Sequence, residues 1–364
     1  MRCTLTEHLL PLAEPFVTAI GTVTRRVVWV VAIADDAGHI GLGEAAPLPV
    51  FGGEDPLTCG ETLRTALPQL TTDSILAWLD RGRPDAAIGR LEPLLAKAPC
   101  ARSAIEGALI DLLSQRLGQP VAETLAGGPS LDSVPVNVVL GGPKEAVVLQ
   151  AERHLARGFT CFKLKAGGDA GADLFRLRAL REVLGPGPSI RVDANGAWTL
   201  ERARDFLDAG REHNLEYCEQ PLPVADLEGS AALRKGTGIL IAIDEGVRHP
   251  SDVARIAAAQ AADLIVLKPM FLGGWRATRQ ATELARSQGL EVVISTAIDG
   301  SVGRAHATHM AAALGLGRRA QGLATGGLLA GDLTDAPLQP ISGSIGILDR
   351  PGLGIGRLLA AATA

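Results

Sequence analysis

The sequence predicts an α/β protein built on a modified (β/α) barrel of the TIM type, with an N-terminal α+β capping domain that the C-terminal segment completes. From residue 134 to about residue 330, short apolar strands alternate with helical segments rich in Ala, Arg and Leu, as in a parallel βα sheet. Eight units of similar length, about 24 to 29 residues each, favour a closed barrel over an open doubly wound sheet. The predicted strand ends lie near Gly141, Lys165, Asp193, Glu219, Asp244, Lys268, Ser295 and Ala324.

The N-terminal part of the chain follows a different pattern. Residues 26–34 form an apolar, β-branched run, residues 35–38 give a turn signal, and residues 39–45 resume the strand pattern. This succession predicts an antiparallel meander. A helix is predicted over residues 101–118, because apolar side chains recur on one helical face before a Gly and a Pro end the pattern. That face carries Ile105, Leu109, Leu112, Leu113 and Leu117.

These patterns divide the chain into three predicted parts. Residues 1–130 form the capping domain, and residues 131–328 form the catalytic barrel. Residues 329–364 are rich in Gly and Pro, with a strand-like run at residues 345–348. We expect this C-terminal segment to pack back on the capping domain.

Composition excludes several classes of protein. The 364 residues are 47% hydrophobic and carry a formal net charge of −5, unlike a disordered chain or a nucleic-acid-binding protein. The longest apolar run is far shorter than the roughly 20 residues that cross a bilayer. Five scattered cysteines and the lack of a secretory signal after Met1 indicate a cytoplasmic protein without a disulfide framework. We expect small soluble partners; the oligomeric state stays open, although exposed barrel surfaces often pair.

Lysine is rare and unusually placed. Only six of the 35 basic residues are lysine, and Lys163, Lys165 and Lys268 lie in or at the end of strand-like runs. A titratable amine has chemical uses there that a permanently charged guanidinium lacks.

Three acids follow three consecutive predicted strands. Asp193, Glu219 and Asp244 would meet at one mouth of a barrel, where their charges would repel unless a cation lay among them. Oxygen ligands without His or Cys suit Mg²⁺, with Mn²⁺ as the alternative, and leave positions for substrate oxygens such as those of a carboxylate. The sequence therefore predicts a divalent metal site and a small carboxylate substrate.

The lysines would flank this site from opposite sides. Lys163 and Lys165 share one face of their strand by its two-residue period, and Lys268 approaches from the sixth strand. Crowding of cations lowers the pKa of an amine, so one member of the Lys-x-Lys pair could act as a neutral general base. The metal would then stabilise the enediolate that forms when a carboxylate loses its α-proton.

With these residues in place, the sequence resembles the enolase superfamily, in its muconate-cycloisomerase-like subgroup. The resemblance spans nearly the whole chain, and the lysine on the sixth strand separates it from the mandelate-racemase subgroup, whose base on that side is a histidine. The motifs that carry the resemblance are Lys163-x-Lys165, Asp193-x-Asn195, Glu219-Gln-Pro, Asp244-Glu-Gly and Lys268-Pro.

Within that subgroup, residues 41–54 and 322–327 are similar to those of o-succinylbenzoate synthases, dehydratases of menaquinone biosynthesis. The resemblance implies that Lys165 removes the α-proton, that Mg²⁺ and Lys268 stabilise the enediolate, and that hydroxide leaves with help from an acid on the same side. Residues 41–54 would form a loop closing over the barrel mouth. The resulting candidates for the pocket lining are Phe16, Thr18, Val50 and Phe51.

Other activities remain open. A dipeptide epimerase would carry Asp-x-Asp at the eighth strand, and a muconate cycloisomerase usually has a carboxylate there, whereas this chain has Ala324-Thr-Gly326. N-succinylamino-acid racemases use both lysines, so racemisation is the main alternative. Lys165 alone would also suit a Schiff-base aldolase, which needs no acid triad. A catalytically silent binding paralogue would usually have lost a ligand or a lysine, and this chain has kept both.

Several further residues have two interpretations each. Asn195 and Glu245 either orient the metal ligands or are ordinary turn and helix-start residues. Ser295, Ser301 and Gly303 either bind a substrate carboxylate through hydroxyl and backbone donors or cap a helix. His306 and His309 lie in a helical pattern, where we expect a structural or surface role rather than metal ligation.

Overall fold

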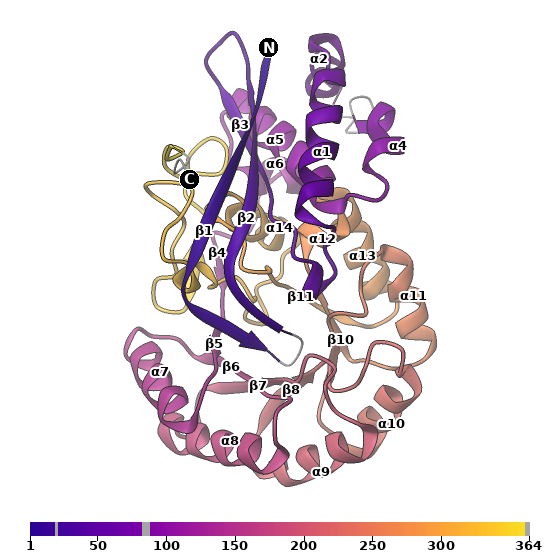
Figure 1. Cartoon of the computed structure of the whole chain (residues 1–364), viewed down its shortest axis with the longest axis vertical. Helices are drawn as coiled ribbons and strands as arrows, with labels where there is room; N and C mark the ends of the chain where they lie inside the picture. The colour runs from indigo at the N-terminus through magenta and orange to yellow at the C-terminus, as the bar shows by residue number, and fades with distance from the viewer. Residues whose placement is uncertain (19–20, 82–87, 361–364) are drawn as a thin grey trace.

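The N-terminal part of the computed structural model is an antiparallel sheet covered by helices (Figure 1). The structure describes residues 1–18, 21–81 and 88–360. Strands β1 (Arg2–Thr18), β2 (Gly21–Ala34) and β3 (Ile40–Ala45) pair in that order, which confirms the predicted meander. The helices of this part are α1 (Pro56–Ala66), α2 (Thr72–Arg81), α4 (Glu92–Leu95), α5 (Pro99–Leu117) and α6 (Val121–Ala126), with 3₁₀ turns at Pro49–Phe51, Leu67–Gln69 and Gly89–Leu91.

Helix α5 is the central helix of the capping domain and packs directly on β3. A Cβ atom at Gly41 or Gly43 would overlap the carbonyl oxygens of Ala108 and Ala104, so only glycine allows this approach. The predicted apolar face is buried along most of the helix, but Leu117, in its last turn, is 55% exposed. The structure therefore confirms the helix and shortens its buried face by one turn.

The second part is a curled parallel sheet whose helices lie on its outer side (Figure 1). Its order is β11-β10-β9-β8-β7-β6-β5, so each strand pairs with the next one along the chain. The strands are β5 (Val138–Leu140), β6 (Cys161–Lys165), β7 (Ser189–Asp193), β8 (Leu215–Glu219), β9 (Ile241–Ile243), β10 (Leu264–Leu267) and β11 (Glu291–Ile294). The helices are α7 (Lys144–Ala156), α8 (Ala170–Leu184), α9 (Leu200–Gly210), α10 (Leu227–Thr237), α11 (Pro250–Ala258), α12 (Pro269–Leu272), α13 (Trp275–Ser287) and α14 (Ser301–Ala313), with 3₁₀ turns at Arg211–His213 and Gly326–Leu328.

The eighth predicted strand, near Ala324, is not a regular strand in the structure. Instead, Gln321 forms a parallel bridge with Val136 and Gly322 forms one with Ser295. The two bridges join the two ends of the seven-stranded sheet, since Val136 precedes β5 and Ser295 follows β11. The prediction of eight equal units is thus corrected to seven strands and one bridging segment, whose glycines disfavour a longer strand.

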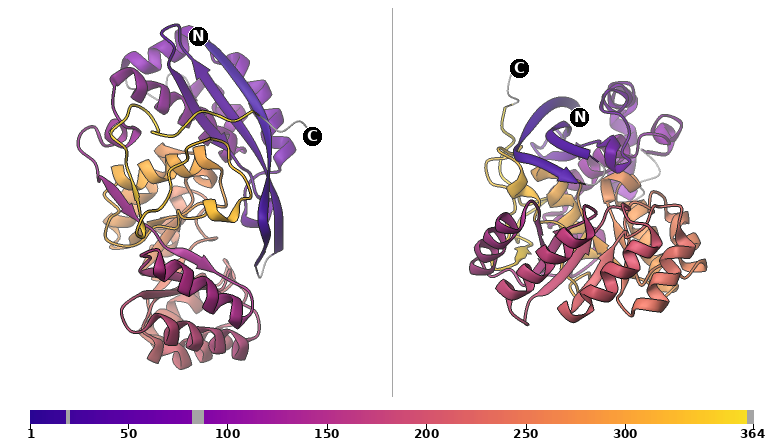
Figure 2. Two further views of the ribbon diagram at one scale, coloured as in Figure 1. Left: turned by 90° about the vertical axis from the view of Figure 1, so that its left-hand side faces the viewer. Right: turned by 60° about the horizontal axis from the view of Figure 1, so that its bottom comes forward.

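The C-terminal segment returns from the barrel towards the cap, as the yellow trace in Figure 2 shows. Strand β12 (Ser344–Gly346) pairs antiparallel with β4 (Ser133–Pro135). Further on, the amide of Leu353 donates to the carboxylate of Asp111 in α5 at 3.0 Å. The limits of the three parts, at residues 130 and 328, stay predictions. No helix in the described ranges combines the length and apolarity that a bilayer crossing requires.

Candidate active site

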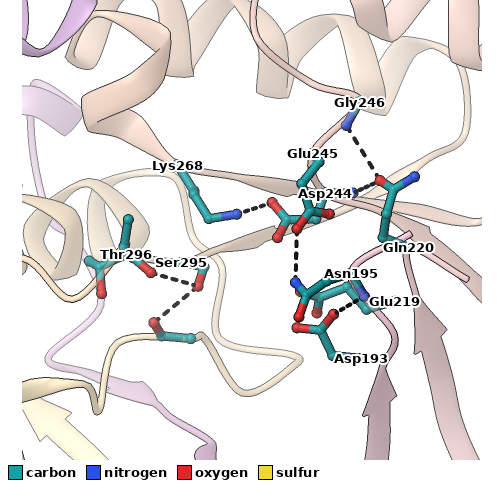
Figure 3. Close-up of polar contacts among 12 residues, drawn as sticks. Asp193, Asn195, Glu219, Gln220, Asp244, Glu245, Gly246, Lys268, Ser295 and Thr296 are labelled. Carbon is teal, nitrogen blue, oxygen red and sulfur yellow. Dashed lines mark hydrogen bonds and ion pairs between the residues drawn. The ribbon is translucent and has the colours of Figure 1, made fainter. Parts of the chain in front are cut away.

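The three predicted metal-binding acids lie together at the carboxyl ends of neighbouring strands (Figure 3). Asp193 and Glu219 are the last residues of β7 and β8 and are register partners, and Asp244 directly follows β9. All three are buried, with at most 5% exposure. The parallel register of the sheet therefore brings side chains together that are about 25 residues apart in sequence.

Each acid is paired with a lysine. The Nζ atom of Lys163 lies 2.8 Å from Oε1 of Glu219 and 3.0 Å from Oδ2 of Asp193. Lys165 donates to Oδ2 of Asp193 at 2.6 Å. On the other side of the acids, Lys268 forms an ion pair with Asp244. The structure thus gathers the three lysines and the three acids that the sequence singled out.

Burial and charge act in opposite directions on these groups. Burial works to raise the pKa of Asp193, but the ammonium groups of Lys163 and Lys165 outweigh it and hold that pKa well below its usual range. Burial and the charge of Asp193 raise the pKa of Glu219 to about 8. Burial works to lower the pKa of Lys163, yet Asp193 and Glu219 raise it well above its usual value. Lys163 is therefore held as an ammonium ion rather than as the neutral base that crowding alone would favour.

The donor set fits Mg²⁺ by its chemistry. As the side chains are oriented here, no three His, Cys, Asp or Glu groups of the described residues are close enough to enclose an ion, because each acid is turned to a lysine. The ligands are nevertheless all carboxylate oxygens, the type that Mg²⁺ prefers. The ammonium of Lys163 already lies between Asp193 and Glu219, which shows that these two acids accept a shared cation.

Asn195 contacts an acid and a lysine of the site, and Glu245 contacts Asn195. Asn195 donates through Nδ2 to Oε1 of Glu245 at 2.8 Å, and its Oδ1 accepts from Lys165 at 2.9 Å. Its backbone φ of 45° is left-handed, and its amide donates to Oδ1 of Asp193. This geometry supports the interpretation that Asn195 orients Asp193 and Lys165.

Gln220 is a functional candidate that the sequence reasoning missed. Its Oε1 accepts from the amides of Asp244 and Gly246 at 3.0 and 3.4 Å, and it lies between β8 and the loop after β9 (Figure 3). Gln220 therefore holds the backbone of Asp244 in place. The Glu219-Gln-Pro motif contained the signal, but nothing in a single sequence indicates the side chain's partner.

A cavity of about 50 Å³ lies beside the lysines and acids. Of the predicted lining residues, Phe16, Phe51 and Ser295 contribute to it. Val50 does not line it and is 45% exposed, and the side chain of Thr18 lies outside the described residues. The full lining is Phe16, Phe51, Val139, Lys163, Lys165, Asp193, Asn195, Asp244, Lys268, Ser295, Thr296, Ala297, Ile298, Gly322, Thr325 and Leu328.

Ser301 and Gly303 do not line this cavity. They lie at the start of α14, where the amide of Ser301 donates to Asp332 and that of Gly303 donates to Glu44, both at 2.6 Å. The start of this helix therefore binds carboxylates, but they are side chains of the protein itself and not a substrate.

After Ser295, the wall that follows β11 is formed by residues to which the sequence assigned no role. Thr296 shares a 2.8 Å hydrogen bond with Thr325, and Ala297 and Ile298 follow it in the lining. The sequence predicts a strand end near Ser295 but does not show which of the side chains around it face the cavity.

The two histidines of α14 are buried structural groups, as expected. His306 hydrogen bonds the carbonyl of Leu42, and His309 bonds that of Leu353.

Residues 41–54, predicted as one closing loop, are divided: residues 41–45 are buried in β3, and Phe51 lies in the short turn Pro49–Phe51 that reaches the cavity.

Comparison with known proteins covers almost the whole chain. Residues 1–126 match the profile of the mandelate racemase / muconate lactonizing enzyme N-terminal domain, and residues 146–357 match that of the enolase C-terminal domain-like family. The L-Lys-D/L-Arg epimerase of Methylococcus capsulatus is 33% identical over 356 residues, which cover 96% of each chain. The o-succinylbenzoate synthase of Thermobifida fusca is 40% identical over 220 residues, which cover 59% of this chain and 67% of that one.

Solved structures agree with these relatives. The dipeptide epimerase of Enterococcus faecalis V583, complexed with Mg and the dipeptide L-Leu-L-Tyr, superposes with a TM-score of 0.90 at 25% sequence identity. The superposition covers 98% of this chain and 99% of the epimerase.

Proposed function

The chain belongs to the mandelate racemase / muconate lactonizing enzyme family of the enolase superfamily, and we propose that it removes the proton α to a carboxylate in a Mg²⁺-dependent reaction. The observation that carries the proposal is the placement of Lys165 and Lys268 in the lining of one cavity, each paired with a different acid of the Asp193, Glu219 and Asp244 set.

The roles follow from the contacts of each group. Asp193, Glu219 and Asp244 would hold Mg²⁺, which when bound supplies positive charge for the substrate carboxylate as its α-proton leaves. Lys165 takes that proton, and Asn195 holds its Nζ atom at 2.9 Å. Lys268, on the side of Asp244, stabilises the negative charge that develops on the substrate.

For the finer activity, we propose dehydration to o-succinylbenzoate. Lys165 removes the α-proton, a double bond forms as the bond from the neighbouring carbon to its hydroxyl group breaks, and the departing hydroxide takes a proton from the Lys165 ammonium to leave as water. Apolar side chains from several elements, Phe16, Val139 and Leu328 among them, line the cavity and suit a ring that becomes aromatic in this step.

The principal alternative is racemisation of an N-succinylamino acid. It uses the same two lysines, one on each side of the α-carbon. A dipeptide with a free ammonium group fits less well, because Asp193 and Asp244 are the only acids in the described lining. Muconate cycloisomerisation lacks a carboxylate partner at the bridging segment for the same reason.

The deciding experiment is a substrate panel with the Mg²⁺-loaded protein. We expect the o-succinylbenzoate precursor to be dehydrated with a higher kcat/KM than N-succinylamino acids are racemised, or than muconate and dipeptides are converted. Proton NMR in D₂O would follow product formation and α-deuterium incorporation together. Deuterium incorporation with racemisation alone would favour the racemase. Turnover of dipeptides alone would contradict both assignments.

A further inference from the structure

A buried carboxylate of the cap lies at the start of a barrel helix. Glu44, in β3, is 2% exposed, and its two oxygens accept the amide protons of Gly300 and Gly303 at 2.6 Å each. These amides begin α14, a helix of 13 residues. A Cβ atom at Gly300 would lie 2.9 Å from Oε2 of Glu44, and one at Gly303 would lie 3.1 Å from its carboxyl carbon. Glycine at both positions therefore permits the contact.

A buried cation of the cap lies beside the same segment. The guanidinium of Arg26, in β2, donates to the carbonyl of Ile298 at 3.3 Å and to those of Pro47 at 2.9 Å and Ala46. Arg26 is only 1% exposed. Ile298 has a φ of 60°, a conformation that costs a β-branched residue free energy and persists only when neighbouring groups hold it.

The cavity wall ends at the first of these two contacts. Ala297 and Ile298 line the cavity, with Arg26 bound to the carbonyl of Ile298 and Glu44 bound to the amide of Gly300, two residues on. Neither Arg26 nor Glu44 lines the cavity itself. Both act on it through backbone groups of another domain.

We propose that Glu44 and Arg26 are positioning residues that set the shape of the wall formed by Ala297 and Ile298, so that the cap controls how tightly the substrate binds. The expected effect on substrate binding rests on the proposed function, whereas the effect on the structure of the wall rests on the contacts alone. Because Lys165 and Lys268 lie on other strands, substrate binding depends on the wall more than proton removal does.

A second cap glutamate provides a matched control. Glu106, in α5, is 1% exposed and accepts the amide proton of Arg276 at the start of α13. Gly274 again permits the approach, since a Cβ atom there would overlap Oε2 of Glu106. Its contact segment, residues 274–276, does not line the cavity. Glu106 therefore shares the burial and the helix-start contact of Glu44 but not the cavity wall.

The kinetic test compares Glu44→Gln with Glu106→Gln. Both oxygens of the Glu44 carboxyl group accept an amide proton. In glutamine, an NH₂ group replaces one of these oxygens, so one backbone N–H would face another donor and lose its hydrogen bond. We expect Glu44→Gln to raise KM about tenfold or more, with kcat changed less than about threefold. Glu106→Gln should keep KM within about twofold of the wild type. Equal KM values for the two variants, or an unchanged KM in Glu44→Gln, would overturn the proposal.

The structural test needs no substrate. Hydrogen–deuterium exchange of the Mg²⁺-loaded protein should show faster exchange over residues 294–304 in Glu44→Gln and unchanged exchange there in Glu106→Gln. Unchanged exchange in Glu44→Gln would show that Glu44 does not position the wall. If wild-type protein turns over no member of the panel, the proposed function fails, while the exchange result still decides the role of Glu44. If Glu44→Gln does not fold, Arg26→Lys, which keeps the charge but not the fork of donors, decides by the same two measurements.

Discussion

Lys163 and Lys165 lie two residues apart on β6 but have different surroundings. Lys163 lies between Glu219 and Asp193, whereas Lys165 contacts Asp193 and the neutral side chain of Asn195. An amine between two carboxylates is strongly stabilised in its charged form. Lys163 is therefore suited to balancing charge, and Lys165 to exchanging a proton with the substrate.

We predict that Lys165→Ala and Lys268→Ala each lower kcat by about 10³-fold, in the range of a lost general base or charge stabiliser. Mg²⁺ binding, measured by calorimetry, should persist in both variants because the acids remain. Lys235→Ala, at an exposed position, is the control and should keep wild-type turnover. If the Lys165→Ala protein still incorporated deuterium at the substrate α-carbon at the normal rate, Lys165 would not be the base.

His309 makes stability depend on pH. Its Nδ1 accepts the amide proton of Ala122 at 3.0 Å, and its Nε2 donates to the carbonyl of Leu353 at 3.1 Å. Protonation of Nδ1 would break the first bond. Burial lowers the pKa of His309 to about 4 and outweighs the hydrogen bond to Leu353, which works to raise it; His306 adds a smaller lowering effect.

The unfolded chain therefore binds a proton at His309 between pH 6.5 and about 4 that the folded chain does not. Stability from this group is present above pH 6.5 and is lost as pH falls towards 4. We predict that wild type loses about 2 kcal/mol more than His309→Asn between pH 7.5 and 5, measured by urea unfolding. An equal loss in both proteins would contradict the assignment, and His249→Asn, at an exposed site, should behave as wild type.

At the scale of elements, close backbone contacts decide which helix lies on which strand. β3 approaches α5 so closely that its Gly41 and Gly43 have no room for a side chain. Glycines at the contact likewise allow Glu44 to approach α14 and Glu106 to approach α13. Small residues at these positions are consequences of packing between elements and not of local flexibility.

We predict that Gly43→Ala lowers the free energy of unfolding by about 1–3 kcal/mol, the usual cost of overpacking, because its Cβ would overlap the carbonyl of Ala104. Chemical denaturation would measure the loss. Gly128→Ala is the control, since a Cβ atom there would have no neighbour within 4 Å. A Gly43→Ala protein as stable as Gly128→Ala would show that β3 can move away from α5 at no cost.

For the molecule as a whole, metal binding and stability are linked. The acids of three strands share a buried site with the three lysines, and a divalent ion that binds only the folded state stabilises it by mass action. The cap takes part through Phe16 and Phe51, which line the same cavity. Loading the site should therefore stabilise the complete protein and not one isolated loop.

We predict that Mg²⁺ at about 100 times its Kd raises the free energy of unfolding by about 2.7 kcal/mol, and that EDTA reverses the effect. Differential scanning calorimetry would show a matching rise in Tm. Asp244→Asn should lose most of this response. Glu216→Gln, which alters an acid that pairs with Arg191 and Arg319 instead, should keep it. A response that survives in Asp244→Asn would place the ion elsewhere.

Much of the fold and the chemistry was determined by the sequence alone. The regular spacing of apolar strands predicted the parallel sheet, because a βα unit needs about that length to return to the same edge. Polar residues at strand ends predicted that Asp193, Glu219 and Asp244 would meet Lys165 and Lys268. These inferences hold because local backbone geometry fixes two things: the two-residue period of a strand, and the shared edge at which parallel strands end.

Only the tertiary structure decided what depends on contacts between distant segments. It replaced the eighth strand by a bridging segment, because Gln321 and Gly322 form bridges beside the two edge strands of the sheet, which no local pattern connects to them. It showed that the start of α14 is filled by Glu44, 259 positions from Gly303. A sequence shows that a helix start can bind a carboxylate; which carboxylate arrives there is decided by the packing of the two domains.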